Sequence, residues 1–291
     1  MMTTSAQASR LSVAAVQFCA GPDWSRNRAQ LEQLLPQAEG AALVLLPENF
    51  ACYGGNYRQL AQASSEIHDW LAGWAQRLNA TLVAGSLPQH LRADDSEVAA
   101  PRVRAASLVF APDGHLQARY DKLHLFDVDV ADAQGRYCES ATFEPGDRVV
   151  TTDIAGVTTG LAICYDLRFA SLAQALAVRG ARLLLYPSAF TQVTGAAHWE
   201  LLLRTRAVET GCYVLAANQC GQHNERRASY GHSLLADPWG QVVAQLEAAP
   251  GVLRAELDLT HQQDIRNNLP LLAQQRLHVE LPNGIAFEHQ S

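Results

Sequence analysis

The feature that most constrains the fold is an alternation of short apolar runs with longer amphipathic segments. The apolar runs 11–18, 41–46 and 81–87 predict strands, and the segments 24–38 and 67–79 between them predict helices. A strand–helix–strand rhythm of this kind predicts a largely buried sheet with helices packed on it. We therefore expect an α/β protein.

The second half of the chain repeats this order. Residues 160–165 and 182–187 predict strands on either side of a helix at 170–179, and the run 252–257 is expected to close the sheet of this half. Two halves with the same order suit two sheets that pack face to face with helices outside them.

No linker separates the two halves, so we expect one domain over residues 11–275 between an N-terminal tail, 1–10, and a C-terminal tail, 276–291. Residues 1–10 lack the apolar core of a signal peptide. No apolar run approaches the ~20 residues that a membrane span requires. We therefore expect a cytoplasmic protein that does not associate with membranes.

The composition argues against two further classes of partner. A formal net charge of −7 disfavours nucleic acid, since phosphate binding needs clustered Lys and Arg. The 10 histidines form no H-E-x-x-H or H-x-H pair, so we predict no metal site and no cofactor. The 6 cysteines form no C-x-x-C pair and are expected to be free thiols in a reducing compartment.

Three reactive side chains stand at the ends of predicted strands. Glu48 follows an apolar run and a proline, Lys122 follows the expected return strand of a hairpin, and Cys164 follows Gly-Leu-Ala-Ile. In α/β sheets, ligands bind beyond the carboxyl ends of the strands, where groups far apart in sequence can converge. We expect these three residues to meet in one cavity.

In order and spacing, these residues resemble the nitrilase superfamily of carbon–nitrogen hydrolases. Three motifs carry the resemblance, Leu-Pro-Glu-Asn at 46–49, Tyr-Asp-Lys-Leu-His-Leu at 120–125 and Ile-Cys-Tyr-Asp-Leu-Arg-Phe at 163–169. The resemblance covers about residues 11 to 275. It implies a four-layer αββα sandwich that assembles as a homodimer or a larger homo-oligomer.

The chemistry that the resemblance implies is attack of a thiol on a small-molecule amide. A thiol attacks well only as the thiolate, so Cys164 needs a base, and Glu48 is the candidate. Lys122 and the backbone N–H of Tyr165 would stabilise the oxyanion. Ammonia or an amine departs and a thioester on Cys164 remains, which water then hydrolyses.

Further site residues come from the same resemblance. The segment 139–146 resembles the family's Glu-Ser…Pro-Gly stretch, which implies that Glu139 positions Lys122 and the substrate amide. Phe190 and Thr191 begin a loop expected to shape the pocket. His124 either contacts the substrate or is a buried, hydrogen-bonded histidine.

Three segments of the C-terminal half, 186–190, 194–200 and 218–233, are similar to the amidase branch that includes deaminated glutathione amidase. The implied substrate is glutathione with its amino group replaced by a ketone, whose carboxylates need cationic partners. By position, Arg226 and Arg227 are the candidates.

Asp166 and Arg168 are expected to form an internal ion pair that holds the nucleophile's turn.

Three alternatives remain open from the sequence. The first is an omega-amidase that acts on 2-oxoglutaramate-like amides. The second is an N-acyltransferase, in which an amine intercepts the thioester. The third is a catalytically silent scaffold, which the intact set of Glu48, Lys122 and Cys164 disfavours.

Overall fold

Two mixed sheets form the centre of the protein in the computed structural model, which describes residues 9–277 and 280–290. Most of the expected tail 1–10 lies outside these residues. The first sheet has the strand order β16-β1-β2-β3-β4-β5. Its strands are β1 (Arg10–Gln17), β2 (Leu43–Leu45), β3 (Thr81–Gln89), β4 (Arg104–Phe110), β5 (Leu116–Asp121) and β16 (Gly251–Asp258).

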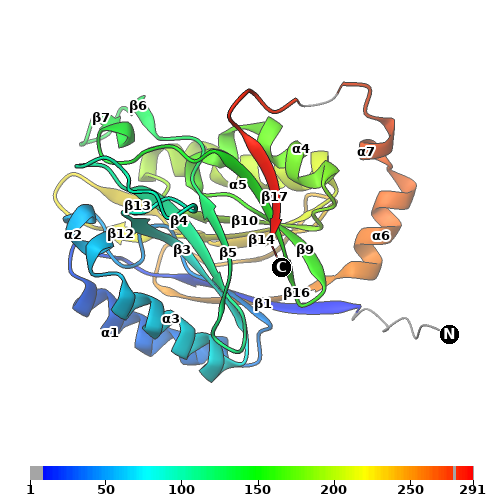
Figure 1. Ribbon diagram of the computed structural model, residues 1–291. Helices are drawn as coiled ribbons and strands as arrows, with labels where there is room; N and C mark the ends of the chain where they lie inside the picture. Colours follow the sequence, from blue (N-terminus) through cyan, green and yellow to red (C-terminus); the bar gives the residue numbers. More distant parts are fainter. Residues whose placement is uncertain (1–8, 278–279, 291) are drawn as a thin grey trace.

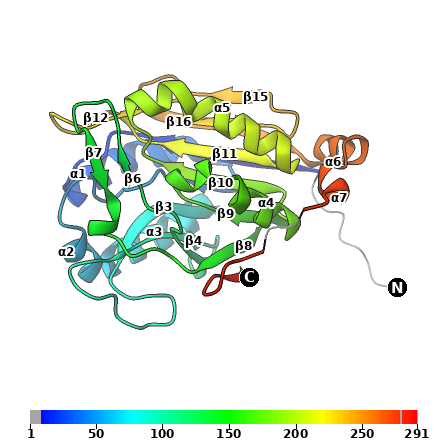
Figure 2. The ribbon, with the colours of Figure 1, turned by 90° about the horizontal axis from the view of Figure 1, so that it is seen from above.

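The second sheet has the order β15-β14-β11-β10-β9-β8-β17, with β9, β10 and β11 parallel at its centre. Its strands are β8 (Arg148–Ile154), β9 (Val157–Leu161), β10 (Leu183–Ser188), β11 (Tyr213–Asn218), β14 (Leu234–Ala236), β15 (Val242–Gln245) and β17 (Ala286–Gln290). The carboxyl ends of its parallel strands point to the same edge as those of β2 and β3 in the first sheet (Figures 1 and 2).

Helices cover the outer face of each sheet, which gives the four-layer αββα sandwich (Figures 1 and 2). Helices α1 (Trp24–Leu34) and α3 (Ser65–Leu78) cover the first sheet, and α4 (Ala170–Val178) and α5 (Gln192–Thr210) cover the second. In α3, the buried residues Ile67, Trp70, Leu71, Trp74 and Leu78 follow the helical period, so one face packs on the sheet.

Short elements fill the connections, several of them around the cavity described below. They are η1 (Leu35–Ala38), α2 (Tyr57–Gln62), β6 (Asp127–Asp129), β7 (Arg136–Cys138), η2 (Glu139–Ala141), η3 (Cys164–Arg168), β12 (Cys220–Gln222), β13 (Ala228–Tyr230), α6 (Leu259–Asn268) and α7 (Leu271–Gln274). Among the described residues, no helix combines the length and the apolarity that a membrane crossing requires.

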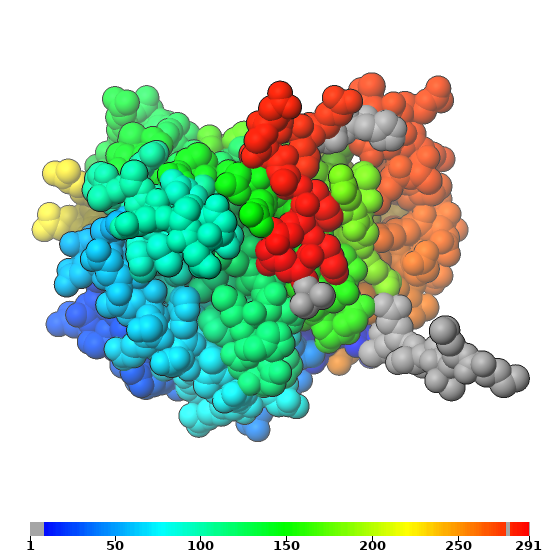
Figure 3. All heavy atoms as spheres, viewed as in Figure 1, coloured from blue at the N-terminus to red at the C-terminus, as the bar shows by residue number. Residues whose placement is uncertain are grey.

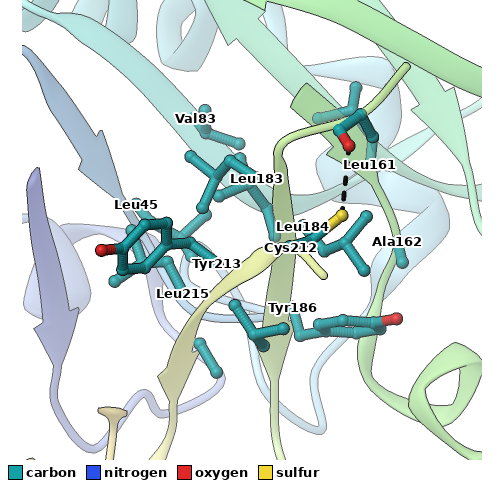
Figure 4. Packing of buried hydrophobic residues seen from close by; sticks show 14 of the residues in the cluster. Leu45, Val83, Leu161, Ala162, Leu183, Leu184, Tyr186, Cys212, Tyr213 and Leu215 are labelled. Carbon is teal, nitrogen blue, oxygen red and sulfur yellow. Dashed lines mark hydrogen bonds between the residues drawn. The ribbon is translucent and has the colours of Figure 1, made fainter. Parts of the chain in front are cut away.

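Apolar side chains from both sheets form the core between them. Leu45 and Val83 of the first sheet belong to the same buried cluster as Leu183, Tyr213 and Leu215 of the second (Figure 4). This packing confirms the expected face-to-face arrangement.

The structure corrects the expected place of the strand at 252–257. This segment is part of β16, which pairs antiparallel with β1 along its whole length, from Arg10 opposite Asp258 to Gln17 opposite Gly251. It therefore completes the first sheet, whereas the second sheet ends at β15 on that side. A strand of the C-terminal half thus belongs to the sheet of the N-terminal half.

The structure also corrects the expected C-terminal tail. Strand β17 lies within residues 276–291 and pairs parallel with β8 at the edge of the second sheet, where the red segment crosses the surface in Figure 3. Arg148 Nη1 donates to Glu288 Oε2 at 2.6 Å, and the guanidinium of Arg179 lies 4.2 Å from the ring centre of Phe287. These contacts hold the segment against the domain.

Candidate active site

Glu48, Lys122 and Cys164 line one cavity of about 680 Å³. Glu48 follows β2, Lys122 directly follows β5, and Cys164 begins η3 after β9. Because the two sheets face each other, these strand ends lie at one edge of the sandwich. The geometric expectation that the three residues share a cavity is met.

The ammonium of Lys122 lies between two carboxylates. Its Nζ donates to Glu48 Oε1 at 2.7 Å and to Glu139 Oε1 and Oε2 at 2.8 and 2.9 Å. Burial favours the neutral amine, but the charges of Glu139 and Glu48 outweigh it and raise the pKa of Lys122 well above its ordinary value. Lys122 is therefore a fixed positive charge at neutral pH.

Glu139 lies in η2 and is held in place by two neighbours. Besides the contact with Lys122, its Oε2 accepts a hydrogen bond from the backbone N–H of Phe126 at 2.6 Å. Burial raises the pKa of Glu139 above its ordinary value, with Lys122 opposing and Glu48 reinforcing the rise. One cation thus serves two carboxylates, and Glu139 binds a proton more readily than a carboxyl group in water does.

Cys164 sits at the start of η3 in a left-handed backbone conformation, with φ 48°. A non-glycine residue pays a conformational cost there, which the surrounding structure must hold in place. Burial and the carboxylate of Glu48 raise the pKa of the thiol well above its ordinary value, while Lys122 and the backbone N–H of Ala189 oppose the rise. The resting group is therefore a thiol, and attack requires a base beside it.

Asp166 connects the turn of the thiol to the segment of the lysine. Its buried carboxylate accepts hydrogen bonds from Tyr120 Oη at 2.7 Å, from His124 N at 3.0 Å and from Ile163 N at 2.9 Å. Tyr120 and His124 flank Lys122, and Ile163 precedes Cys164. One carboxylate therefore fixes the position of both reactive segments relative to each other.

The expected pairing of Asp166 with Arg168 is wrong. The Asp166 carboxylate is occupied by the donors above and by His124 Nδ1 at 2.7 Å. Arg168 points the other way and lines the cavity, where its Nη1 lies 3.3 Å from His198 Nδ1. The sequence signal that could have found it is its place on the same turn as the nucleophile.

His124 does not line the cavity. Its ring stacks on Phe169 with 3.7 Å between ring centres, and its Nδ1 is hydrogen-bonded to Asp166. The sequence left open whether His124 contacts the substrate or is a hydrogen-bonded structural histidine. The geometry fits the second alternative.

Of the other expected substrate contacts, Tyr165, Phe190, Thr191 and Arg227 line the cavity. Arg226 does not, because its side chain is exposed in the turn between β12 and β13. The loops at about 50–58 and 127–138 were expected from the sequence to shape the pocket, but none of their lining residues was named. The structure identifies Tyr53, Tyr57, Arg58, Phe126 and Tyr137. No local motif distinguishes these residues from ordinary loop side chains.

Comparisons with known proteins agree with this architecture. A deaminated glutathione amidase of Yersinia enterocolitica is 38% identical over 96% of this chain and 98% of its own length. Omega-amidase NIT2-A of Xenopus laevis is 37% identical over 92% of this chain and 95% of its own. The crystal structure of the C. elegans NitFhit protein superposes with a TM-score of 0.83 at 37% identity, over 92% of this chain; this chain spans only 65% of NitFhit.

The family model for carbon–nitrogen hydrolases matches residues 12–267, which contain the three strand ends and the cavity that they form. With this match over most of the chain and relatives of this similarity, the protein belongs to the carbon–nitrogen hydrolase family.

Proposed function

We propose that the protein hydrolyses a linear amide, deaminated glutathione, through a thioester on Cys164. The observation that carries the proposal is a buried thiol that shares a cavity with an ammonium held between two carboxylates. The resemblance of the chain to deaminated glutathione amidases at 38–40% identity supports the choice of substrate.

In the proposed first step, Glu48 takes the proton of the Cys164 thiol as sulfur attacks the amide carbon. Lys122 donates to Oε1 of Glu48, and the negative charge of Glu48 is one of the causes that raise the pKa of the Cys164 thiol. Glu48 then gives the proton to the leaving amine, and the C–N bond breaks. The same carboxylate next activates water, which releases the acid and restores the thiol.

The oxyanion formed in each step would be stabilised by two donors. Lys122 is a fixed positive charge in the cavity. Tyr165 is the second residue of η3, so its backbone N–H has no acceptor within the helix and is available to the oxyanion. Glu139 would keep the ammonium in position through its two hydrogen bonds.

A comparison of kcat/KM for deaminated glutathione and 2-oxoglutaramate tests the substrate. We expect a preference for deaminated glutathione. A preference for 2-oxoglutaramate would instead support the omega-amidase alternative, which the similarity to the Xenopus laevis enzyme favours. Formation of an N-acyl product in the presence of an added amine would support acyl transfer.

The variant Cys164→Ala tests the mechanism. We expect kcat/KM to fall by about 10⁴-fold or more because no covalent intermediate can form, while the circular dichroism spectrum is unchanged. Mass spectrometry of the wild type with a thiol-reactive amide should locate the adduct on Cys164. Full activity of the alanine variant, or an unmodified Cys164, would overturn the proposal.

We further propose that the protein is a cytoplasmic homodimer. All six cysteines are free thiols, as expected in a reducing compartment. Leu201 and Val208 on α5, and Trp239 in the turn that contacts α5 through Gly240, are exposed apolar side chains suited to a second copy of the chain. Sedimentation of the wild type and of Leu201→Glu tests this: a dimer should become a monomer.

A further inference from the structure

The cavity holds two guanidinium groups that have no carboxylate partner among the described residues, those of Arg168 and Arg227. Arg168 contacts His198 Nδ1 at 3.3 Å, and Arg227 Nε contacts Gln134 Oε1 at 3.4 Å. Neither contact neutralises the charge. A cation that lines a cavity without an anionic partner is ready to bind an anion there.

A third arginine of the cavity shows the contrast. Arg58 Nη1 donates to the carbonyl oxygens of Val98 and Arg102 at 2.9 and 2.8 Å, and its Nη2 pairs with Glu97 at 2.8 Å. Its hydrogen-bonding capacity is used by the protein itself. Arg58 therefore holds the wall of the cavity, whereas the other two are free to bind a ligand.

A row of aromatic rings separates the two free arginines. Arg227 lies over Tyr137 at 5.6 Å, and Phe126 contacts both Tyr137 and Tyr165 with 5.0 Å between ring centres. Arg168 lies over Tyr165 at 5.9 Å. The guanidinium groups thus stand at the two ends of the row Tyr137–Phe126–Tyr165, all of which line the cavity.

Their positions relative to the nucleophile differ as well. Cys164 begins and Arg168 ends the same five-residue helix, η3, so Arg168 is held at a fixed distance from the thiol. Arg227 lies in the loop between β12 and β13, over the ring of Tyr137 at the other end of the row. Arg168 therefore belongs to the same turn as the atom that would carry the acyl group, whereas Arg227 belongs to a separate loop.

We propose that Arg168 and Arg227 select an amide that carries a carboxylate on each side of the scissile bond. Arg168 binds the carboxylate of the acyl half, and Arg227 binds that of the leaving amine. The inference rests on the proposed function and adds to it, because deaminated glutathione has this arrangement, whereas 2-oxoglutaramate carries only the acyl carboxylate. Arg227 is then the residue that favours the larger substrate.

Three substrates and matched variants test this assignment. The substrates are deaminated glutathione, 2-oxoglutaramate, and the butyryl amide of cysteinylglycine, which keeps only the carboxylate of the leaving half. With Arg168→Gln, we expect kcat/KM to fall by about 10- to 100-fold for the first two and by less than about fivefold for the butyryl amide. With Arg227→Gln, we expect the large fall in kcat/KM for deaminated glutathione and the butyryl amide, and not for 2-oxoglutaramate.

Arg226→Gln is the control, since it removes the same charge from the neighbouring, exposed position, and all three substrates should react as with the wild type. Arg→Lys at either site should restore only part of the loss, because a lysine cannot bind a carboxylate in a bidentate manner. Iodoacetamide, which is neutral, should alkylate Cys164 at the wild-type rate in each folded variant.

Equal losses on all three substrates, or wild-type kcat/KM on deaminated glutathione in both variants, would overturn the inference. Failure of the proposed function gives a different result, in which the wild type itself does not prefer deaminated glutathione. If a glutamine variant does not fold, the lysine variant decides, since the substrate-dependent pattern must still appear in it at reduced size.

Discussion

Glu139 and Glu144 belong to the same short segment and expose the same fraction of their side chains, 14%, yet they have opposite acid–base properties. Glu139 shares one ammonium with Glu48, and burial raises its pKa. Glu144 accepts hydrogen bonds from Arg92 Nε and Arg104 Nη2, each at 2.7 Å. These two guanidinium groups lower the pKa of Glu144 to about 2. Burial is the dominant influence on Glu139, whereas the hydrogen bonds and charges of two guanidinium groups outweigh burial at Glu144.

The difference in pKa matches a difference in role, since Glu139 belongs to the candidate active site and Glu144 stabilises the fold. A carboxylate with two guanidinium partners stays ionised and fixes the strands around it. A buried carboxylate that shares its cation with another has a raised pKa, as at Glu139. The cavity contains the second kind, next to a thiol whose proton has to be moved.

Among changes to the two carboxylates and their partners, the largest expected effect comes from removing the cation that Glu48 and Glu139 share. In Lys122→Met, we expect kcat/KM to fall by about 10³-fold, because Glu48 and Glu139 lose their ammonium and the oxyanion loses a donor. Arg92→Met is the matched change at the other carboxylate, where Arg104 remains. The kcat/KM of Arg92→Met should stay within about threefold of that of the wild type. Equal losses in the two variants would show that the two carboxylates do not differ in function.

Exchanging each glutamate for glutamine sharpens the comparison. We expect Glu139→Gln to lower kcat by about 10²-fold with little change in the free energy of unfolding, since Lys122 loses its orientation. Glu144→Gln should instead lower the free energy of unfolding by about 2 kcal/mol, because the buried guanidinium of Arg104 and the partly exposed one of Arg92 lose their charged partner. Urea unfolding and steady-state kinetics of both variants measure this, and the reverse pattern would contradict it.

The pH dependence of stability should have opposite signs at the two sites. The lowered pKa of Glu144 contributes stability that is complete above pH 4.5 and is lost as the pH falls toward about 2. The difference in unfolding free energy between the wild type and Glu144→Gln should therefore shrink from pH 7 to pH 3. Relative to Glu139→Gln, the wild type should lose stability as the pH rises above 4.5, since the pKa of Glu139 is raised.

The smallest effect is expected at an ion pair with neither burial nor a second partner. Arg10 and Glu256 join β1 to β16 at 3.3 Å, with 67% and 58% of their side chains exposed. Glu256→Gln should change the free energy of unfolding by less than about 0.5 kcal/mol, because water screens the pair. A loss as large as that of Glu144→Gln would show that exposure is less decisive than we infer.

The sequence predicted the fold class because hydrophobic periodicity is a local property. It identified the segment 252–257 as a strand but assigned it to the wrong sheet, since a strand's partners are set by the packing of the whole chain. It missed β17 for a similar reason, because a short edge strand with mixed polarity has no distinctive pattern.

The candidate site could be predicted only in part. The convergence of Glu48, Lys122 and Cys164 followed from their places at strand ends, and Glu139 followed from the resemblance alone. The direction of a long side chain is not a local property, which is why Arg168 was expected to pair with Asp166. It is also why Arg226 and its neighbour Arg227 were expected to act alike, although only Arg227 lines the cavity.

The pairing of β1 with β16 has a consequence for synthesis on the ribosome. Strands β1 to β5 emerge within the first 121 residues, but the edge of β1 has no partner until residues 251–258 have followed. During this interval the nascent chain exposes the backbone N–H and C=O groups of a long apolar strand, a surface on which aggregation begins. Chaperones should therefore bind nascent chains stalled before residue 258 has left the exit tunnel. They should no longer bind chains stalled after this point.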